Sequence, residues 1–150
     1  MLKKPEKLLF FSAIPHSVTK NLDNQGLRSI ANDYDLFFID IWGVVHNGIQ
    51  LHDKAIETLV EIEKIKKQYV LLTNAPRPNK TVKKFLEKMG MEKNIQKKVY
   101  TSGEAALSYL KKNHLNEVFY HIGPPRDFDL FIDFKNNKTK NIDECSYFLC

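Results

Sequence analysis

The sequence has little cysteine, and both of its cysteines, Cys145 and Cys150, lie within the last six residues. They match no zinc-binding or redox spacing, and a separation of five residues within an apolar run is a poor basis for a disulfide. We therefore expect both thiols to be reduced and to be incidental to the structure.

Long apolar runs are also lacking. No stretch approaches the roughly 18 apolar residues that a transmembrane helix needs. The apolar run Leu8–Phe11 is too short for a signal-peptide core, and Pro15 and His16 interrupt the segment after it. We read residues 1–16 as an N-terminal arm of a cytoplasmic protein that has no membrane partner.

A third absence concerns nucleotide cofactors. A dinucleotide-binding domain needs a Gly-x-Gly-x-x-Gly segment after its first strand. Gly43 and Gly48, which come after the first predicted strand, do not supply it, and the sequence has no internal repeat. The sequence therefore argues against dinucleotide binding.

Charged residues of both signs are plentiful, with 23 basic and 18 acidic side chains and a net charge of +5. The lysines are dispersed along two predicted helices, at positions 64, 66 and 67 and at positions 83, 84 and 88. Such lysines suit a helix C-terminus or solvate an outer face. We expect no nucleic-acid partner.

The apolar pattern alternates between strands and helices. It predicts strands at residues 36–39, 68–72, 98–101 and 117–122, and helices at residues 17–32, 53–67, 79–89 and 102–112. Asp53 and Ser102 are predicted helix caps, and Gly90 is placed to end the third helix. This order is typical of a parallel sheet with helical crossovers.

The pattern loosens after Pro125. Residues 136–138 read as a loop, and residues 145–150 as the start of another strand. Because the chain ends inside that apolar run, we expect a product that has been cut short.

Polar residues come after the first two predicted strands. Asp40 lies directly after one, and Thr73 and Asn74 lie directly after the other. Ligands of parallel sheets bind beyond the carboxyl ends of the strands. An aspartate there can attack a phosphoryl group or bind Mg²⁺, and a Thr-Asn pair before a helix suits a phosphate. By itself, an aspartate after a strand more often forms a turn or caps a helix, and a Thr-Asn pair routinely caps helices.

The combination resembles the haloacid dehalogenase superfamily. Residues 37–48 resemble its first motif, a strand ending in Asp-x-Asp-Gly, in the class IIA or NagD-like form. Residues 71–74 resemble its second motif, and residues 99–110 resemble the segment that leads into the class IIA cap. The resemblance implies an α/β fold. The N-terminal half of a Rossmann-like core would cover residues 17–115, and residues 116–150 would begin a C2-type α/β cap.

The resemblance also implies a chemistry. Asp40 would be the nucleophile that forms an aspartyl-phosphate, and Thr73 and Asn74 would hold the transferring phosphoryl group. Mg²⁺ would be bound by the Asp40 carboxylate and the main-chain carbonyl of Trp42. The expected substrate is a small phosphorylated metabolite.

Two departures from the family pattern argue against full activity. Trp42 replaces the second aspartate of motif one, the general acid/base, and such a loss typically costs about 10²–10⁴-fold in rate. His46 offers another proton donor, although a structural role in a turn is favoured. The lysine and acidic cluster of motifs three and four are missing. We expect a weakly active or inactive chain, or alternatively a non-catalytic binding or vestigial fragment.

Several other polar residues are not assigned to the site. We interpret Asp127, Asp129 and Asp133 as the solvent face of an alternating segment rather than as metal ligands. Lys138 and Lys140 read as loop lysines. We expect core or surface roles for the remaining histidines, which show no ligand spacing: His52, His114 and His121.

Overall fold

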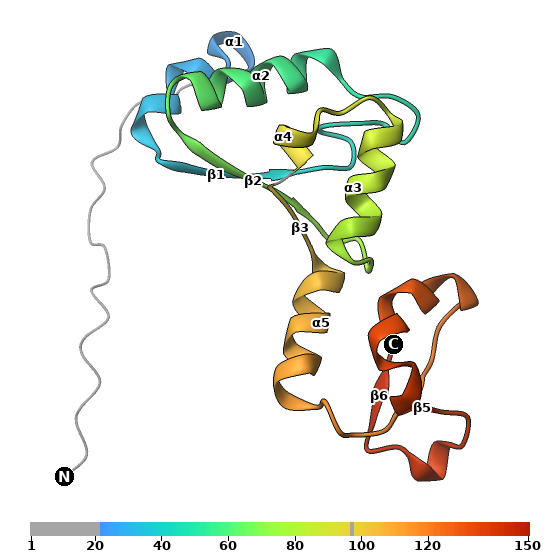
Figure 1. Cartoon of the computed structure of the whole chain (residues 1–150). Coiled ribbons are helices and arrows are strands. Elements are labelled where there is room, and N and C mark those ends of the chain that lie inside the picture. Colours follow the sequence, from blue (N-terminus) through green and yellow to red (C-terminus); the bar gives the residue numbers. More distant parts are fainter. Residues whose placement is uncertain (1–21, 97) are drawn as a thin grey trace, which may run out of the picture. The chain divides into compact units, whose positions relative to one another are not determined.

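The computed structural model describes residues 22–96 and 98–150 (Figure 1). The chain divides into two compact units, residues 1–34 and residues 35–150, and each is described by itself. The arm predicted at residues 1–16 lies outside the described residues. The predicted domain boundaries at residues 16 and 115 stay predictions.

The described part of the first unit consists of short turns. They are α1 (Leu22–Gln25) and two 3-10 turns, η1 (Leu27–Ser29) and η2 (Ala31–Asp33). The prediction of one helix over residues 17–32 is therefore wrong over its described part. Gly26, between α1 and η1, has a φ of 67°, which favours glycine and interrupts the helix.

A three-stranded parallel sheet opens the second unit. Its strands are β1 (Leu36–Asp40), β2 (Gln68–Thr73) and β3 (Val99–Thr101), in the order β1-β2-β3. The crossovers contain α2 (Asp53–Lys64) and then α3 (Asn79–Lys88) and α4 (Lys93–Gln96). These strands confirm the α/β fold and the parallel sheet with helical crossovers predicted from the sequence.

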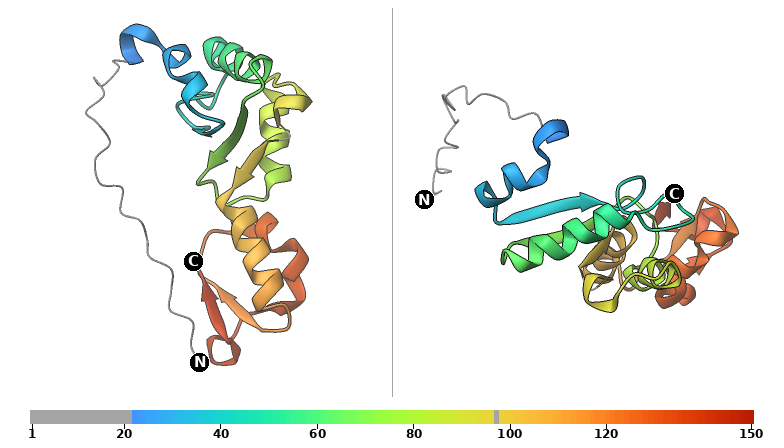
Figure 2. Two further views of the ribbon diagram at one scale, coloured as in Figure 1. Left: turned by 90° about the vertical axis from the view of Figure 1, so that its left-hand side faces the viewer. Right: turned by 90° about the horizontal axis from the view of Figure 1, so that it is seen from above.

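The helices bury one face of this sheet. Side chains alternate between the two faces of a strand, so Tyr69 and Leu71 of β2 lie on the covered face, where both are buried. The crossover helices contribute buried Leu59, Leu86 and Ile95, and Figure 2 shows α2 running alongside the sheet. The opposite face exposes apolar side chains from all three strands: Leu36, Phe38, Leu72 and Tyr100.

Two predicted helix caps are corrected. Asp53 is the first residue of α2, which has no side-chain cap, and Ser102 is the first residue of α5 (Ser102–Asn113). Thr101 caps α5, because its extended backbone lets its Oγ1 accept a 2.9 Å hydrogen bond from the Glu104 amide. Gly90 comes after α3 as predicted, with a φ of 92°.

A second parallel sheet lies beyond α5 in the chain. It consists of β4 (Phe119–His121), β5 (Lys138–Thr139) and β6 (Tyr147–Leu149), in the order β5-β4-β6. Two 3-10 segments, η3 (Pro125–Asn137) and η4 (Ile142–Glu144), lie between the strands. The strand predicted within residues 145–150 is confirmed as β6. The prediction of a loop at residues 136–138 is wrong, because Asn136 and Asn137 end η3 and Lys138 pairs with β4.

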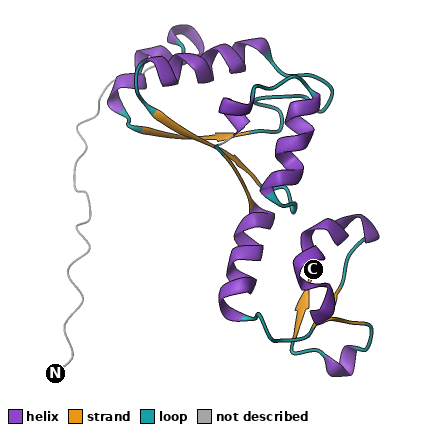
Figure 3. Cartoon of the chain, in the orientation of Figure 1, coloured by secondary structure: helices purple, strands orange, loops and turns teal. Residues whose placement is uncertain are grey.

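The second sheet has its own core. Figure 3 shows the two groups of strands apart, with α5 between them. A buried cluster joins α5, β4 and η3 and consists of Leu107, Leu110, Phe119, Phe131 and Phe134. The fourth predicted strand therefore does not extend the first sheet, because its apolar side chains pack against α5 and η3 instead.

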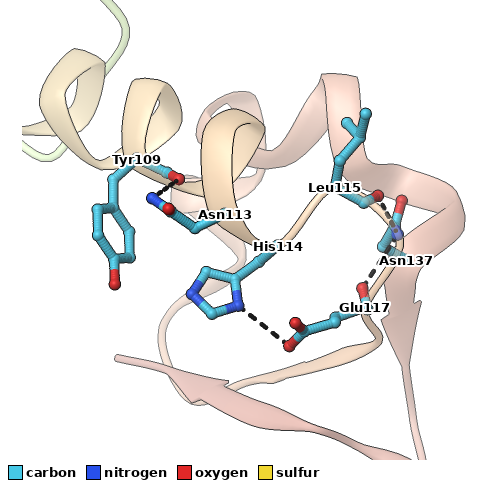
Figure 4. Close-up of polar contacts among 6 residues, drawn as sticks. All are labelled: Tyr109, Asn113, His114, Leu115, Glu117 and Asn137. Atoms are coloured by element: carbon cyan, nitrogen blue, oxygen red, sulfur yellow. Dashed lines mark hydrogen bonds and ion pairs between the residues drawn. The ribbon is translucent and has the colours of Figure 1, made fainter.

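Polar contacts fix the turn between α5 and β4 (Figure 4). The Asn137 side chain, at the end of η3, donates 3.0 Å hydrogen bonds to the carbonyls of Leu115 and Glu117. His114 lies 3.0 Å from the Glu117 carboxylate and contacts the ring of Tyr147. These contacts give His114 a structural role, in agreement with the sequence-based expectation.

Across the described parts of the chain, the helices are too short and too polar to traverse a bilayer. The cytoplasmic location stays a prediction.

Candidate functional site

The structure brings Asp40, Thr73 and Asn74 together at the carboxyl ends of β1 and β2. All three line one pocket of about 430 Å³, together with Phe38 and Leu72. The parallel register explains this, because it pairs Asp40 with Leu72 and so places Thr73 one residue beyond Asp40. The residues predicted from two separate segments therefore share one site, while their chemical roles stay predictions.

Asp40 lies exposed at the end of β1. One of its carboxylate oxygens, Oδ1, accepts a 2.7 Å hydrogen bond from the amide of Ile41. This hydrogen bond holds one carboxylate oxygen against the backbone of the next residue.

Thr73 and Asn74 differ in exposure. Thr73 is only 9% exposed, and its Oγ1 accepts a 3.2 Å hydrogen bond from the Ala75 amide. A hydroxyl that accepts in this way still has its own hydrogen to donate. Asn74 is exposed and begins the loop to α3. Both residues line the pocket, and their side chains carry one hydroxyl and one amide.

The loop after β2 is held by the start of α5. The Ser102 hydroxyl lies 2.9 Å from the carbonyl oxygens of both Asn74 and Ala75, and the Gly103 amide donates to Ala75 at 3.2 Å. A Cβ on Gly103 would lie 2.5 Å from backbone atoms of Arg77. From the sequence, Ser102 and Gly103 are assigned to the segment that leads into the cap domain, and their contact with the β2–α3 loop is not predicted.

The start of α3 is tied to the same junction. The amide of Asn79 donates to the Glu104 carboxylate at 2.9 Å, and the Asn79 side chain accepts from the Thr101 amide at 3.0 Å. Glu104 therefore caps α3 from a different helix. The only sequence signal was a glutamate in the first turn of α5, which by itself suggests a cap for α5.

His46 is a buried part of the loop after β1. It is 3% exposed, its Nδ1 accepts a 2.9 Å hydrogen bond from the Gly48 amide, and its ring packs against Phe85. Burial, and secondarily the charge of His52, lowers the pKa of His46. These contacts favour the structural role over the role of proton donor.

The acidic residues of η3 make specific contacts. Asp129 forms an ion pair with Arg77 and accepts a 3.0 Å hydrogen bond from Thr81, and Asp133 pairs with Lys111 at 2.9 Å. The interpretation of an alternating solvent face is therefore wrong for Asp129, because η3 is a 3-10 segment that turns this residue toward α3. The side chain of Asp127 lies outside the described residues.

The pocket does not form a complete magnesium site. Asp40 is the single carboxylate among its lining residues, and among the residues described no three His, Cys, Asp or Glu side chains cluster as metal ligands. Mg²⁺ favours octahedral oxygen coordination, usually with one or two carboxylates plus phosphate and water. One carboxylate and the Trp42 carbonyl leave most of that shell unfilled.

Solved structures share this fold. A haloacid dehalogenase-like hydrolase from Brucella suis is 28% identical, with a TM-score of 0.69 over 83% of this chain and 45% of its own. A putative NagD protein is 23% identical, with a TM-score of 0.54 over 65% of this chain and 38% of its own. A magnesium complex of a glycerol phosphate phosphatase from Mycobacterium tuberculosis is 22% identical, with a TM-score of 0.53 over 73% and 32%.

These comparisons define a partial match. The chain spans less than half the length of each of these three proteins. No protein of curated function matches it in sequence. The sequence profile of the haloacid dehalogenase-like hydrolases matches residues 37–134, which is more than half of the chain. With both motif-like segments at the sheet's carboxyl end, the chain belongs to the haloacid dehalogenase-like hydrolase family.

Proposed function

We propose that this chain carries the phosphate-binding part of a class IIA phosphatase site and binds a small phosphorylated metabolite. By themselves, these 150 residues would turn it over slowly or not at all. The observation that carries the proposal is the shared pocket, which Asp40, Thr73 and Asn74 line together at the carboxyl ends of β1 and β2. A nucleophile and two hydrogen-bond donors at one sheet edge suit phosphoryl transfer, which depends mainly on positioning and charge.

In the proposed reaction, an Asp40 oxygen attacks phosphorus and the bond to the leaving oxygen breaks. Water then hydrolyses the aspartyl-phosphate. Thr73 and Asn74 would donate hydrogen bonds to the phosphoryl oxygens and hold them in line with Asp40. Asp40 and the Trp42 carbonyl are the proposed Mg²⁺ ligands, but the incomplete shell gives no basis for assigning a step to the metal.

Slow turnover is expected from two features. The Trp42 indole is a hydrogen-bond donor only and cannot exchange a proton at neutral pH. His46, the nearest alternative in sequence, is buried and has its Nδ1 occupied by the Gly48 amide. Without a general acid or base, the rate falls by about 10²–10⁴-fold.

The comparison with the glycerol phosphate phosphatase supports the substrate class. The name of that protein gives a small phosphorylated metabolite as its substrate, and its structure contains magnesium. At 22% identity this likeness establishes the fold alone, so for the present chain the substrate class is part of the proposal.

The proposal is tested by binding and turnover together. Inorganic phosphate should shift the backbone amide resonances of Thr73 and Asn74 in a saturable manner. The same titration of Asp40→Asn should give equal or tighter binding, because the substitution removes a negative charge beside the anion. Hydrolysis of p-nitrophenyl phosphate with Mg²⁺ should stay near background in both proteins.

Two results would contradict the proposal in different ways. Robust Mg²⁺-dependent turnover that disappears in Asp40→Asn would overturn the predicted inactivity and establish the nucleophile. Unchanged Thr73 and Asn74 resonances at saturating phosphate would remove the phosphate site. Phosphate binding without turnover would favour the non-catalytic binding alternative over a weak enzyme.

A further inference from the structure

Trp42 has an exposed side chain that packs against residues of its own loop. Its side chain is 64% exposed, although it is one of the largest apolar groups in the chain. The six-membered part of the indole lies directly over Gly48. A Cβ at Gly48 would come within 2.6 Å of the Trp42 Cη2 atom and 2.9 Å of Cζ3. Residue 48 must therefore lack a side chain for the indole to lie where it does.

The residues that the indole packs against are themselves buried or hydrogen-bonded. The His46 ring meets the Trp42 ring edge to face, with centroids 5.2 Å apart and an interplanar angle of 89°. The hydrogen bond from the Gly48 amide fixes the His46 ring, and the Gly43 amide donates to the His46 carbonyl at 2.8 Å. Edge-to-face packing is a favoured aromatic arrangement. The loop thus holds the indole in one orientation while leaving most of it in water.

Trp42 is close in the chain to Asp40, which lines the phosphate pocket. It lies two residues beyond Asp40, so their Cα atoms are separated by no more than about 7 Å. Trp42 does not itself line that pocket, so the indole would meet the organic group of a phosphate ester that is bound at Asp40 and extends past the end of β1. An exposed indole buries apolar surface only when a ligand or partner covers it.

We propose that Trp42, seated on His46 and Gly48, is a stacking platform for a planar ring carried by the phosphorylated ligand. The inference rests on the phosphate pocket of the proposed function and narrows its ligand to phosphate monoesters of an aromatic or heteroaromatic group. Stacking on an aromatic face tolerates many rings, because each presents a π-face. Trp42, which occupies the position of the family's general acid/base, would then bind the ligand instead of transferring a proton.

The chain contains a single tryptophan, so its fluorescence reports on Trp42 alone. Phenyl phosphate should quench or shift this emission with saturation, whereas glycerol phosphate and inorganic phosphate should not. The Asn74 amide resonance should give a dissociation constant for phenyl phosphate at least fivefold lower than for glycerol phosphate.

Substitutions separate stacking from folding. Trp42→Ala should raise the phenyl phosphate dissociation constant to that of glycerol phosphate. Trp42→Phe should keep most of the preference. Ile49→Ala, which shortens a more exposed apolar side chain in the same loop, is the matched control and should keep all of it.

The two readouts distinguish the two proposals. Unchanged Trp42 emission with equal affinities for phenyl and glycerol phosphate would overturn the stacking platform and leave the phosphate pocket standing. Quenching by phenyl phosphate without any shift at Asn74 would overturn the phosphate pocket instead. A loss of preference in the Ile49→Ala control would also count against Trp42 as the source of the effect.

Discussion

Gly103 shows how one residue shapes the candidate site. It is the second residue of α5, where alanine would ordinarily be the better helix former. Its Cα, however, faces the backbone of Arg77 at a distance that leaves no room for a Cβ. Since Arg77 lies beyond Asn74 in the same loop, the glycine helps to determine how the β2–α3 loop lies.

Gly103→Ala should therefore destabilise the protein despite the gain in helix propensity. Forcing a methyl group against backbone atoms costs about 1–3 kcal/mol in packed sites. The free energy of unfolding can be measured with urea, and the Asn74 amide resonance should move. Ser108→Ala, an exposed substitution in the same helix, is the control. If both variants are equally stable, the contact with Arg77 has no energetic weight.

At the scale of elements, charged contacts connect η3 to α3 and α5. Asp129 joins η3 to Arg77 and Thr81, and Asp133 joins it to Lys111. The buried cluster around Phe131 and Phe134 packs η3 against α5 and β4. The charged contacts are more exposed than this cluster, so their contribution is modest and depends on pH.

The Asp133–Lys111 contact gives a pH-dependent prediction. The hydrogen bond from Lys111, and then its charge, holds the pKa of Asp133 below its usual value. A lowered carboxylate pKa contributes stability that is fully present above the ordinary aspartate pKa of about 3.9 and is lost as the pH falls through the lowered pKa of the folded protein. Asp133→Asn should thus lower the Tm at pH 7 and lower it by less near pH 3.

The control for this prediction is Asp143→Asn, which changes an exposed aspartate in η4. It should leave the Tm close to that of the unsubstituted chain at both pH values. A Tm difference for Asp133→Asn that persists unchanged at pH 3 would show that the effect arises from packing, not from charge.

At the scale of the whole molecule, one face of the first sheet is apolar and exposed. Parallel sheets are normally covered on both faces. Here Leu36, Phe38, Leu72 and Tyr100 lie exposed on the face opposite α2 and α3, and Phe38 is 68% exposed. Such a patch favours self-association, and edge strands favour it further.

Phe38→Thr should therefore reduce self-association, measured by sedimentation velocity over a range of concentrations. Threonine keeps the preference for a strand while removing most of the apolar surface. Ile49→Thr removes exposed apolar surface from a loop outside the sheet and is the control. Equal effects of the two substitutions would mean that overall hydrophobicity, not the open face, drives association.

Local sequence patterns were enough to predict the elements that depend on neighbouring residues. The apolar runs of β1, β2 and β3, the periodicity of α2 and α3, and the turn at Gly90 could all be recognised from neighbouring residues. The polar residues that line the candidate pocket were also predictable. Carboxyl ends of parallel strands lie at one edge, so Asp40, Thr73 and Asn74 had to come together once the sheet was parallel.

Tertiary structure alone decided the rest, because those features depend on residues far apart in the chain. Which sheet receives β4 depends on packing against Phe131 and Phe134 of η3. The support of the Asn74 loop by Ser102 and the pairing of Asp129 with Arg77 join segments more than 25 residues apart. The packing of Trp42 on His46 and Gly48 joins residues that are closer together in the sequence. This packing required the left-handed turn at Gly48, which the Asn47-Gly48 pair indicates, and also the burial of His46, which local propensity does not show.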